Sequence, residues 1–359
     1  MKVCIIGSGL TSLSLAKSLI NLGLKVDVFS NNYRNNYDNL QTIGISKSNV
    51  DFFNKNILNI DHLLWGVNRI EVFTENLNNE SILDFQNKNK ELFSIIKNNR
   101  LYSHLLLTLK KNKLFNLKKK DKTVFSKKKY ELIINCDIND PITKKFFYNK
   151  LSKNYNSFGH VTIINHKKLI PNNIATQIFT NRGPIAFLPI SQTETSIVYS
   201  IRGKRKIEKA DLENLIKKNF KKYNVKKIHD FKSFELKSTD LRFYYYKNIL
   251  AFGDLLHRLH PLAGQGFNMA LRDIKVLLKI IEFKINLGIQ LDSSVFSEFE
   301  KRTKHHNYLF SNGINFIYEF FNIESKTKNH LFSKSIKALG KNKVVNKFLI
   351  KTADTGIIF

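Results

Sequence analysis

The sequence predicts an α/β fold in which a parallel β-sheet domain is interrupted by an antiparallel-sheet domain and followed by a helical tail. Short apolar runs typical of buried parallel strands occur near the first residues and again at 248–254. Between them, β-branched runs alternate with short turns, as in an antiparallel sheet. Beyond residue 265, apolar residues recur at helical spacing. The second domain therefore divides the first in sequence.

The first thirty residues have the pattern of a strand, a glycine turn, a helix and a second strand. The run "KVCIIG" is short and apolar, as a buried parallel strand should be. Apolar residues then recur at helical spacing over 10–22, and Gly23 occupies the expected C-cap position. The run "KVDVF" at 25–29 predicts the next strand. This order predicts a Rossmann-like domain.

The remaining elements follow the same two hydrophobic periods. Residues 92–112 predict a helix entered near Asn98 and Asn99, and residues 123–136 predict a hairpin whose second strand is buried. Further strands are predicted at 160–165, 183–190, 195–201, 232–246 and 248–254. Helices are predicted at 209–223 and from Phe267 onward, and the apolar anchors of the tail include Phe299, Leu309, Ile314, Phe316 and Phe320.

Domain boundaries follow from these elements. The chain of 359 residues is 42% hydrophobic, which is enough for two domains. We expect the parallel-sheet domain to comprise 1–60, 92–140 and 247–285, the antiparallel-sheet domain to comprise 61–91 and 141–246, and the helical tail to comprise 286–359.

The chain has a formal net charge of +30. This charge fits docking at an anionic membrane surface, or a composition bias that spreads lysines over every exposed face. No nucleic-acid-binding module accompanies it, so we expect no nucleic-acid partner.

The sequence predicts no signal peptide and no membrane span. Cys4 and Cys136 lie in apolar runs and indicate inert thiols. We expect a cytoplasmic protein, peripheral on the inner face of a membrane if the charge serves docking.

The turn after the first strand carries Gly7 and Gly9, with Ser12 where a dinucleotide-binding fingerprint has its third glycine. The first glycine makes the turn, and the second lets a diphosphate approach the backbone at the helix N-terminus. Serine is small enough to keep the helix close to the sheet. The acidic residue that usually binds a ribose is replaced by Ser30. The turn indicates dinucleotide binding, or a structural connection without a ligand.

A second motif, "GDLLHRLHPLAGQGFNMALRD", spans 253–273. Gly253 and Asp254 follow a buried strand, so Asp254 is expected at the carboxyl edge of the sheet, where ligands bind in open α/β sheets. Gly264 and Gly266 then begin a helix, whose exposed backbone N–H groups and dipole favour negative charge.

This pairing of motifs resembles the flavoprotein monooxygenases of the p-hydroxybenzoate hydroxylase type, and more closely the ubiquinone-biosynthesis hydroxylases. The resemblance extends from residue 1 to about 320. It includes "GPIAFLPI" at 183–190 and the helix start at Asn99 and Arg100. The matching residues of the second motif are Gly253, Asp254, His257, His260, Pro261, Ala263, Gly264, Gln265, Gly266, Asn268, Arg272 and Asp273.

The resemblance implies that FAD is the cofactor and that the flavin carries the chemistry, with no catalytic protein residue. Asp254 would hydrogen-bond the ribityl chain, and Arg100 would lie near the cofactor. The loop from Pro261 to Asn268 would lie against the flavin ring, where backbone N–H groups stabilise the charge of the reduced form. His257 and His260 are expected to orient the loop, and no third ligand for a metal is in sight.

Four cofactor-linked positions depart from the family pattern, namely Ser12, Ser30, Gln41 and Ile138. The Ser30 and Gln41 replacements each remove a polar or charged contact worth about 1–3 kcal/mol. We therefore expect FAD to bind more weakly than in relatives.

The implied reaction is hydroxylation of a prenylated phenol by O₂ through a flavin C4a-hydroperoxide, in ubiquinone biosynthesis, with NAD(P)H as a transient reductant. A ubiquinone-biosynthesis complex and an anionic membrane are the expected partners. Phe187 and the tyrosines at 244–246 fit the wall of the phenol pocket, or the core. Two alternatives are another flavin enzyme on the same fold, such as a prenyl reductase or a catabolic aromatic hydroxylase, and a non-catalytic flavoprotein subunit.

Overall fold

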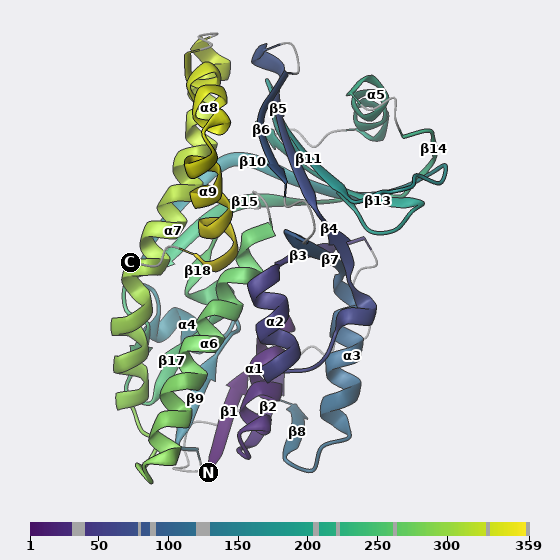
Figure 1. Ribbon diagram of the computed structural model, residues 1–359. Helices are drawn as coiled ribbons and strands as arrows, with labels where there is room; N and C mark the ends of the chain where they lie inside the picture. The colour runs from purple at the N-terminus through teal and green to yellow at the C-terminus, as the bar shows by residue number, and fades with distance from the viewer. Residues whose placement is uncertain are drawn as a thin grey trace.

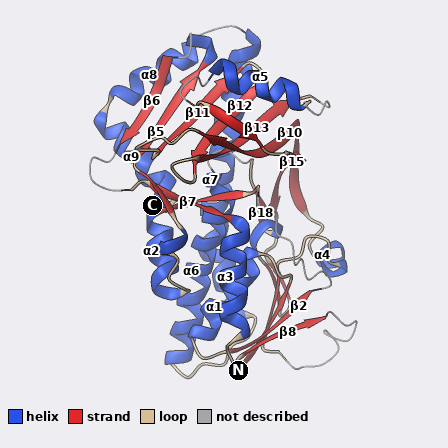
Figure 2. Cartoon of the chain, turned by 90° about the vertical axis from the view of Figure 1, so that its right-hand side faces the viewer, coloured by secondary structure: helices blue, strands red, loops and turns tan. Residues whose placement is uncertain are grey.

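The computed structural model has two large sheets, with long helices beside the first of them and along one side of both (Figures 1 and 2). It describes residues 1–30, 40–77, 80–86, 91–119, 130–203, 208–219, 223–260, 264–327 and 331–356. The first strand of the predicted hairpin at 123–136 lies outside these residues.

The first sheet is parallel except for one edge strand, which confirms the predicted fold class. Its strands, in spatial order, are β16 (Tyr245–Tyr246), β17 (Ile249–Ala251), β9 (Leu132–Asn135), β1 (Lys2–Ile6), β2 (Lys25–Ser30) and β8 (Phe115–Lys119). The central strands read as apolar runs because they are buried on both faces. The helices that pack on this sheet include α1 (Leu10–Asn21), α3 (Asn98–Lys110) and α6 (Gln265–Asn286).

The second sheet has nine strands and is mostly antiparallel. Its strands are β18 (His257–Arg258), β15 (Lys232–Leu241), β10 (Lys150–His166), β13 (Glu194–Arg202), β12 (Gly183–Pro189), β11 (Ile174–Thr180), β5 (Arg69–Thr74) and β6 (Glu80–Gln86), and β14 (Val225–Ile228) pairs with β10. Helix α5 (Lys209–Asn219) covers one face, where Ile216 joins a cluster of buried residues. Phe187 lies in this cluster, so the core alternative holds for it.

A small third sheet joins the two large ones and was not predicted. It contains β3 (Thr42–Ser46), β7 (Phe93–Lys97) and β4 (Trp65–Val67), which pair antiparallel. The helix predicted within 92–112 begins at Asn98, as expected, and ends at Lys110, while the residues before it form β7 and pair with β3. The short helices α2 (Lys47–Asn56) and α4 (Pro141–Phe146) follow β3 and β9.

The C-terminal helices confirm the predicted tail. They are α7 (Ser294–Thr327), α8 (Leu331–Lys341) and α9 (Lys343–Thr355), and α7 runs along one side of both sheets (Figure 1). Phe299 and Ile314 are buried as expected, but Phe316 is 67% exposed and Leu309 37% exposed, so these two anchors were wrong. No helix among the described residues has an apolar stretch long enough to span a bilayer.

Candidate cofactor-binding site

The glycine turn between β1 and α1 presents backbone N–H groups without side-chain partners. Gly7 has φ +101°, and its N–H donates to the Phe29 carbonyl over 2.8 Å. Gly9 is the N-cap of α1, and no side chain caps this helix or places a carboxylate in its first turn. The N–H groups at this helix start are therefore free of the usual intramolecular anion, which suits a diphosphate.

The two glycine motifs meet at the carboxyl edge of the first sheet. Strand β9 lies between β1 and β17, and the Phe252 N–H donates to the Asn135 carbonyl over 2.8 Å. Gly253 has φ +66°, and a Cβ there would lie 3.0 Å from Cγ2 of Thr11 in the first turn of α1. The start of the motif at 253–273 is thus packed against the first turn of α1, directly after the glycine turn, as one shared ligand requires.

Asp254 lies at this junction with its side chain exposed. Desolvation by the surrounding protein raises the pKa of its carboxyl, and the nearby positive groups of His257 and Arg258 oppose the shift. A carboxylate that is accessible from one side and otherwise surrounded by protein suits hydrogen bonds to hydroxyl groups of a ligand.

Behind Asp254, a buried histidine is fixed by α6 and α7. His257 Nε2 lies 2.5 Å from Asp273 Oδ2, and Asn307 donates to the other Asp273 oxygen over 3.0 Å. Burial alone would lower the pKa of His257, but the charge and hydrogen bond of Asp273 outweigh it and raise the pKa. This arrangement holds β18 against α6, which fits an orienting role.

His260 is buried between two tyrosines. Its ring lies 5.0 Å from the Tyr155 ring and 4.2 Å from the Tyr318 ring, and no described residue hydrogen-bonds either ring nitrogen. Burial, assisted by the charge of Arg202, lowers the pKa of His260 to about 3. The imidazole is therefore neutral at physiological pH and packs as an aromatic ring.

The N-terminus of α6 is joined to β3 by Asn268. Gly264 is the left-handed N-cap at φ +63°. The Asn268 amide donates to the carbonyls of Gly44 and Gly264, and its oxygen accepts from the Ser46 N–H and from Asn49. Both donors and both acceptor positions of the amide are used, so Asn268 positions the helix start rather than offering a free hydrogen bond.

The other residues of the second motif differ in what they contact. Gln265 accepts a hydrogen bond from Arg272 over 2.9 Å, and a Cβ at Gly266 would meet nothing within 4 Å. The backbone at Gly266 is therefore open to the approach of a flat ligand. Pro261 and Ala263 lie outside the described residues.

Two of the four departures from the family pattern lie beside the glycine turn. Ser12 is buried, and its Oγ lies 3.4 Å from where a Gly7 Cβ would be, so the small side chain preserves close packing. Ser30, at the end of β2, accepts a hydrogen bond from Ser8 over 2.9 Å. A hydroxyl pair thus occupies the place where relatives of this motif bind a ribose through a carboxylate.

The remaining residues border the site from α3 and β9. Gln41 Oε1 accepts from Asn98 over 3.3 Å, while Asn98 Oδ1 is buried without a hydrogen bond among the described residues. Arg100 is exposed in the first turn of α3, and Ile138 is 37% exposed after β9. An unpartnered buried oxygen at the start of α3 is consistent with a polar ligand here.

Together these residues fit FAD. The start of α1 offers N–H donors for a diphosphate, Asp254 offers an acceptor for a polyol, and the start of α6 offers backbone donors beside the open Gly266. Sequence reasoning missed the contribution of β3, whose Gly44 and Ser46 are held by Asn268. No local pattern indicates a contact across more than two hundred residues.

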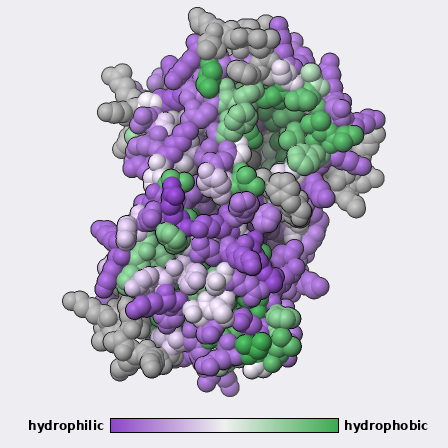
Figure 3. Space-filling view, turned by 90° about the vertical axis from the view of Figure 1, so that its left-hand side faces the viewer, coloured by the Kyte–Doolittle hydropathy of each residue, from purple (hydrophilic) through white to green (hydrophobic). Residues whose placement is uncertain are grey.

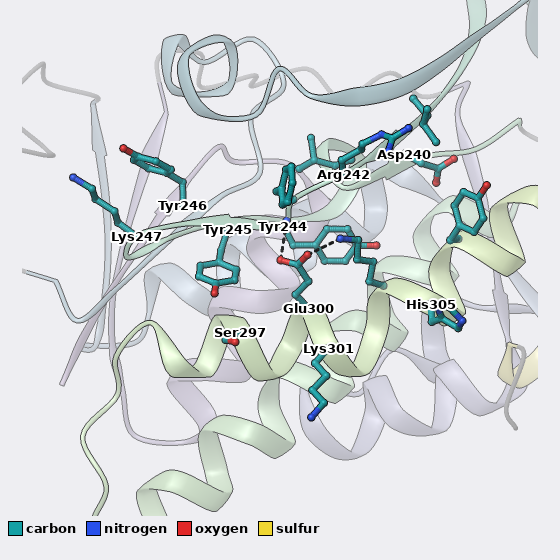
Figure 4. A pocket seen from close by; sticks show the side chains of 15 residues that line it. Asp240, Arg242, Tyr244, Tyr245, Tyr246, Lys247, Ser297, Glu300, Lys301 and His305 are labelled. Atoms are coloured by element: carbon teal, nitrogen blue, oxygen red, sulfur yellow. Dashed lines mark hydrogen bonds and ion pairs between the residues drawn. The ribbon is translucent and has the colours of Figure 1, made fainter.

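A separate open groove of about 1000 Å³ lies between α7 and the loop that joins β15 to β16 (Figure 4). Its lining comes from Leu151, 240–247 and six residues of α7. The lining includes the tyrosines at 244–246 and none of the residues predicted to bind the cofactor. Tyr244 itself is 3% exposed and packs toward Phe299, so that it belongs to the core, whereas Tyr246 is 41% exposed.

Comparisons with known proteins agree with this architecture. A family model described as squalene epoxidase matches residues 129–346. The 3-demethoxyubiquinol 3-hydroxylase of Escherichia coli K12 is 28% identical over 158 residues, which cover 42% of this chain and 40% of that protein. The mitochondrial ubiquinone biosynthesis monooxygenase COQ6 of Homo sapiens is 26% identical over 219 residues, with coverage of 49% and 47%. The chain thus spans less than half the length of these relatives.

Solved structures share the fold over nearly the whole chain. The p-nitrophenol 4-monooxygenase PnpA of Pseudomonas putida aligns with a TM-score of 0.79 at 11% identity, covering 99% of this chain and 98% of that one. HpxO of Klebsiella pneumoniae, solved with FAD and uric acid, aligns with a TM-score of 0.76 at 13% identity, covering 99% and 97%.

Proposed function

Since the chain belongs to the squalene epoxidase family, we propose that it is an FAD-dependent monooxygenase that hydroxylates a phenol ring with O₂. The observation that carries this proposal is the junction of the two glycine motifs. Gly253 packs on Thr11, so that Asp254 and the uncapped start of α1 lie at one edge of the first sheet. The start of α6 lies across from them, next to β3.

In this proposal each part of the site binds a different part of FAD. The N–H groups after Gly9 bind the diphosphate, and Asp254 accepts hydrogen bonds from the ribityl hydroxyls. The backbone at Gly264 and Gly266 lies against the flavin ring, with Asn268 holding that backbone in place. When bound, FAD supplies the reaction with O₂ and the transfer of one oxygen atom. The helix dipole of α6 favours negative charge on the ring.

The substrate we propose is a lipophilic, prenylated phenol. Two relatives bear the names of ubiquinone-pathway hydroxylases, and we propose the same pathway here, with NAD(P)H as reductant. Assembly in a biosynthetic complex and contact with an anionic membrane complete this proposal. A second candidate is a flavoprotein subunit without catalysis, which is favoured by the Ser8–Ser30 pair in place of a ribose-binding carboxylate.

The test begins with the purified chain and FAD. We expect flavin absorbance, a rise in Tm with added FAD, and a loss of FAD affinity of about ten- to a hundredfold in Asp254→Asn, the cost of one charged hydrogen bond. The control is Asp51→Asn, which changes an exposed aspartate of α2 and should leave FAD affinity unchanged. A colourless protein without a thermal shift in excess FAD contradicts the proposal.

Catalysis is tested separately with a prenylphenol, NAD(P)H and O₂. We expect one oxygen atom to enter the ring, detected by mass spectrometry with ¹⁸O₂. FAD binding without any oxygen incorporation, together with rescue of a biosynthetic complex in cells, would support the non-catalytic candidate instead.

A further inference from the structure

The loop at 242–247, which is defined here to include the two-residue strand β16, projects four side chains into solvent from a rigid base. Arg242, Phe243, Tyr246 and Lys247 are exposed, and Phe243 is 59% exposed. The base is rigid because Tyr244 between them is buried, and its N–H donates to Glu300 of α7 over 3.2 Å. Exposed apolar side chains that gather in a patch rimmed by polar residues mark sites of interaction with a protein or a membrane.

Aromatic rings and cations alternate around the groove beside this loop. The Lys304 ammonium lies 5.4 Å from the Phe243 ring, and the Lys247 ammonium lies 5.6 Å from the Tyr246 ring. Tyr246 also stacks on Phe146 at 4.3 Å. Figure 4 shows Tyr246 and Lys247 at one end of the groove and Arg242 near the other, with α7 below them. The loop and α7 therefore each place a lysine against an exposed aromatic ring of the loop.

The positive charge of this region is not neutralised within the described part of the chain. Of the two carboxylates that line the groove, Glu300 pairs with Lys304 over 2.8 Å and Asp240 accepts from Ser311. Arg242 and Lys247 form no ion pair with another described residue. The neighbouring surface adds exposed Lys144, Lys145 and Lys150, and Tyr148, which is 73% exposed.

We propose that the loop at 242–247 and the adjoining groove are the surface by which the protein docks on an anionic phospholipid bilayer. Tyrosine lies favourably at the level of the headgroups because its ring is apolar and its hydroxyl contacts water, while phenylalanine places its apolar ring at the boundary of the acyl chains. Basic side chains beside them attract anionic lipids. This inference rests on the proposed function in one respect, since a prenylated phenol is held in a bilayer.

Docking by this loop differs from insertion of a broad apolar face. Figure 3 shows a mainly hydrophilic surface on the side of α7, where the widest hydrophobic patch lies toward the top of the view and smaller ones lie below it. A rival surface is the outer side of α9, where Val344 and Phe348 are exposed next to lysines. The two surfaces can be compared because α9 also offers two exposed lysines, Lys343 and Lys347.

The test measures binding of the full chain to vesicles of phosphatidylcholine with and without phosphatidylglycerol. The variant Arg242→Gln/Lys247→Gln should lower the partition coefficient about 25-fold on the anionic vesicles, at roughly fivefold per charge removed near the surface. The control, Lys343→Gln/Lys347→Gln, makes the same change in net charge and should lower it less than about threefold. The loss should shrink as salt is raised.

A second variant separates the aromatic contribution from charge. Phe243→Ser keeps every cation and should lower vesicle binding several-fold, with an effect that persists at high salt. A near-ultraviolet spectrum unchanged in all variants shows that they fold. Equal binding by Arg242→Gln/Lys247→Gln and the unaltered chain overturns the proposal, and so does a larger loss in the α9 control.

Other outcomes are also decisive. Saturable binding of ATP that requires Arg242 and Lys247, with unchanged vesicle binding, would assign the groove to a soluble anion and overturn the proposal. Vesicle binding that depends on these residues in a chain unable to bind FAD would support the docking surface while the proposed function fails. FAD affinity should be unchanged in the loop variants, because the docking surface is separate from the proposed cofactor site.

Discussion

The parallel-sheet region and the nine-stranded sheet both contain glycines with positive φ, but these glycines have different surroundings. A Cβ at Gly7, Gly253 or Gly264 would meet its nearest neighbour at 3.4, 3.0 and 3.5 Å. In the nine-stranded sheet, a Cβ at Gly183 would lie 2.0 Å from the Ser200 carbonyl oxygen. The first three glycines are needed for their backbone conformation, which has positive φ, at the sheet edge proposed to bind FAD. Gly183 is needed because the neighbouring strand leaves no space for a Cβ.

The two regions also differ in how they bury charge. Asp27 of β2 is fully buried and accepts from Lys118 over 2.7 Å, Tyr130 over 2.7 Å and Asn116 over 2.9 Å, with Lys2 3.0 Å away. The described inner part of the nine-stranded sheet instead buries hydroxyls and histidines, such as Thr162 and His166. The stability of the first region should therefore depend on pH in the range where a carboxylate is protonated. The stability of the second region should depend on strand packing.

The largest effect is expected from Gly183→Ala. The overlap with the Ser200 carbonyl and a φ of +140° should together lower the free energy of unfolding by about 4 kcal/mol, or prevent folding. Chemical denaturation measures this effect. The matched control is Gly203→Ala, where φ is +102° but nothing lies within 4 Å, so that only the strain of about 1–2 kcal/mol remains. Equal losses in both variants would refute the packing explanation.

Asp27→Asn should lower the free energy of unfolding by about 2 kcal/mol at pH 7. This cost is smaller than that of breaking a fully buried ion pair, because the side chains of Lys2 and Lys118 are 25% and 39% exposed to solvent. Urea titration measures it.

The same residue sets a pH dependence. Burial would raise the pKa of Asp27, but hydrogen bonds from Lys118, Tyr130, Lys2 and Asn116 outweigh it, and the pKa is lowered. Because folding lowers this pKa, the stabilisation is fully present above the unfolded pKa of about 3.9 and is lost as the pH falls below it. Asp27→Asn should flatten the acid limb of stability against pH, and an unchanged limb would count against this account.

Gly264→Ala should cost about 1 kcal/mol of stability, since alanine adopts the left-handed conformation at φ +63° with some strain and the nearest atom is 3.5 Å away. Gly23→Ala, at φ +79° in open space, should cost about the same. FAD affinity, measured by fluorescence titration, should fall only in Gly264→Ala. A similar fall in both variants would mean that the ligand does not approach Gly264.

The smallest effect concerns the junction of the two regions. Lys97 of β7 and Glu194 of β13 pair over 2.9 Å, and both are partly exposed. A double-mutant cycle with Lys97→Met and Glu194→Gln should give a coupling of about 0.5 kcal/mol that decreases with salt. The pair Lys47–Asp51 within α2 serves as a reference for an exposed pair. A salt-independent coupling energy above about 2 kcal/mol would show instead that this pair stabilises the junction between β7 and β13 as strongly as a buried contact does.

The motifs were predictable because they depend on neighbours in the chain. The turn at Gly7 and Gly9, the start of α6 after Gly264 and the buried strand before Gly253 each follow from local residue types. The small sheet of β3, β4 and β7 was not predictable, since its strands pair with residues 26 to 55 positions away in the chain. Phe316 and Leu309 fit a helical apolar period, but α7 is covered on one side only.

By itself, the sequence determined the two glycine motifs and the strands and helices that flank them, because backbone conformation follows from local side chains and hydrophobic period. Only the tertiary structure decided that Asn268 is used up in binding Gly44, 224 residues away, and that Ser30 is paired with Ser8. It also brought Arg242 and Lys247 beside α7 to form a groove. Such contacts depend on how distant strands are ordered in a sheet, and no local pattern records that order.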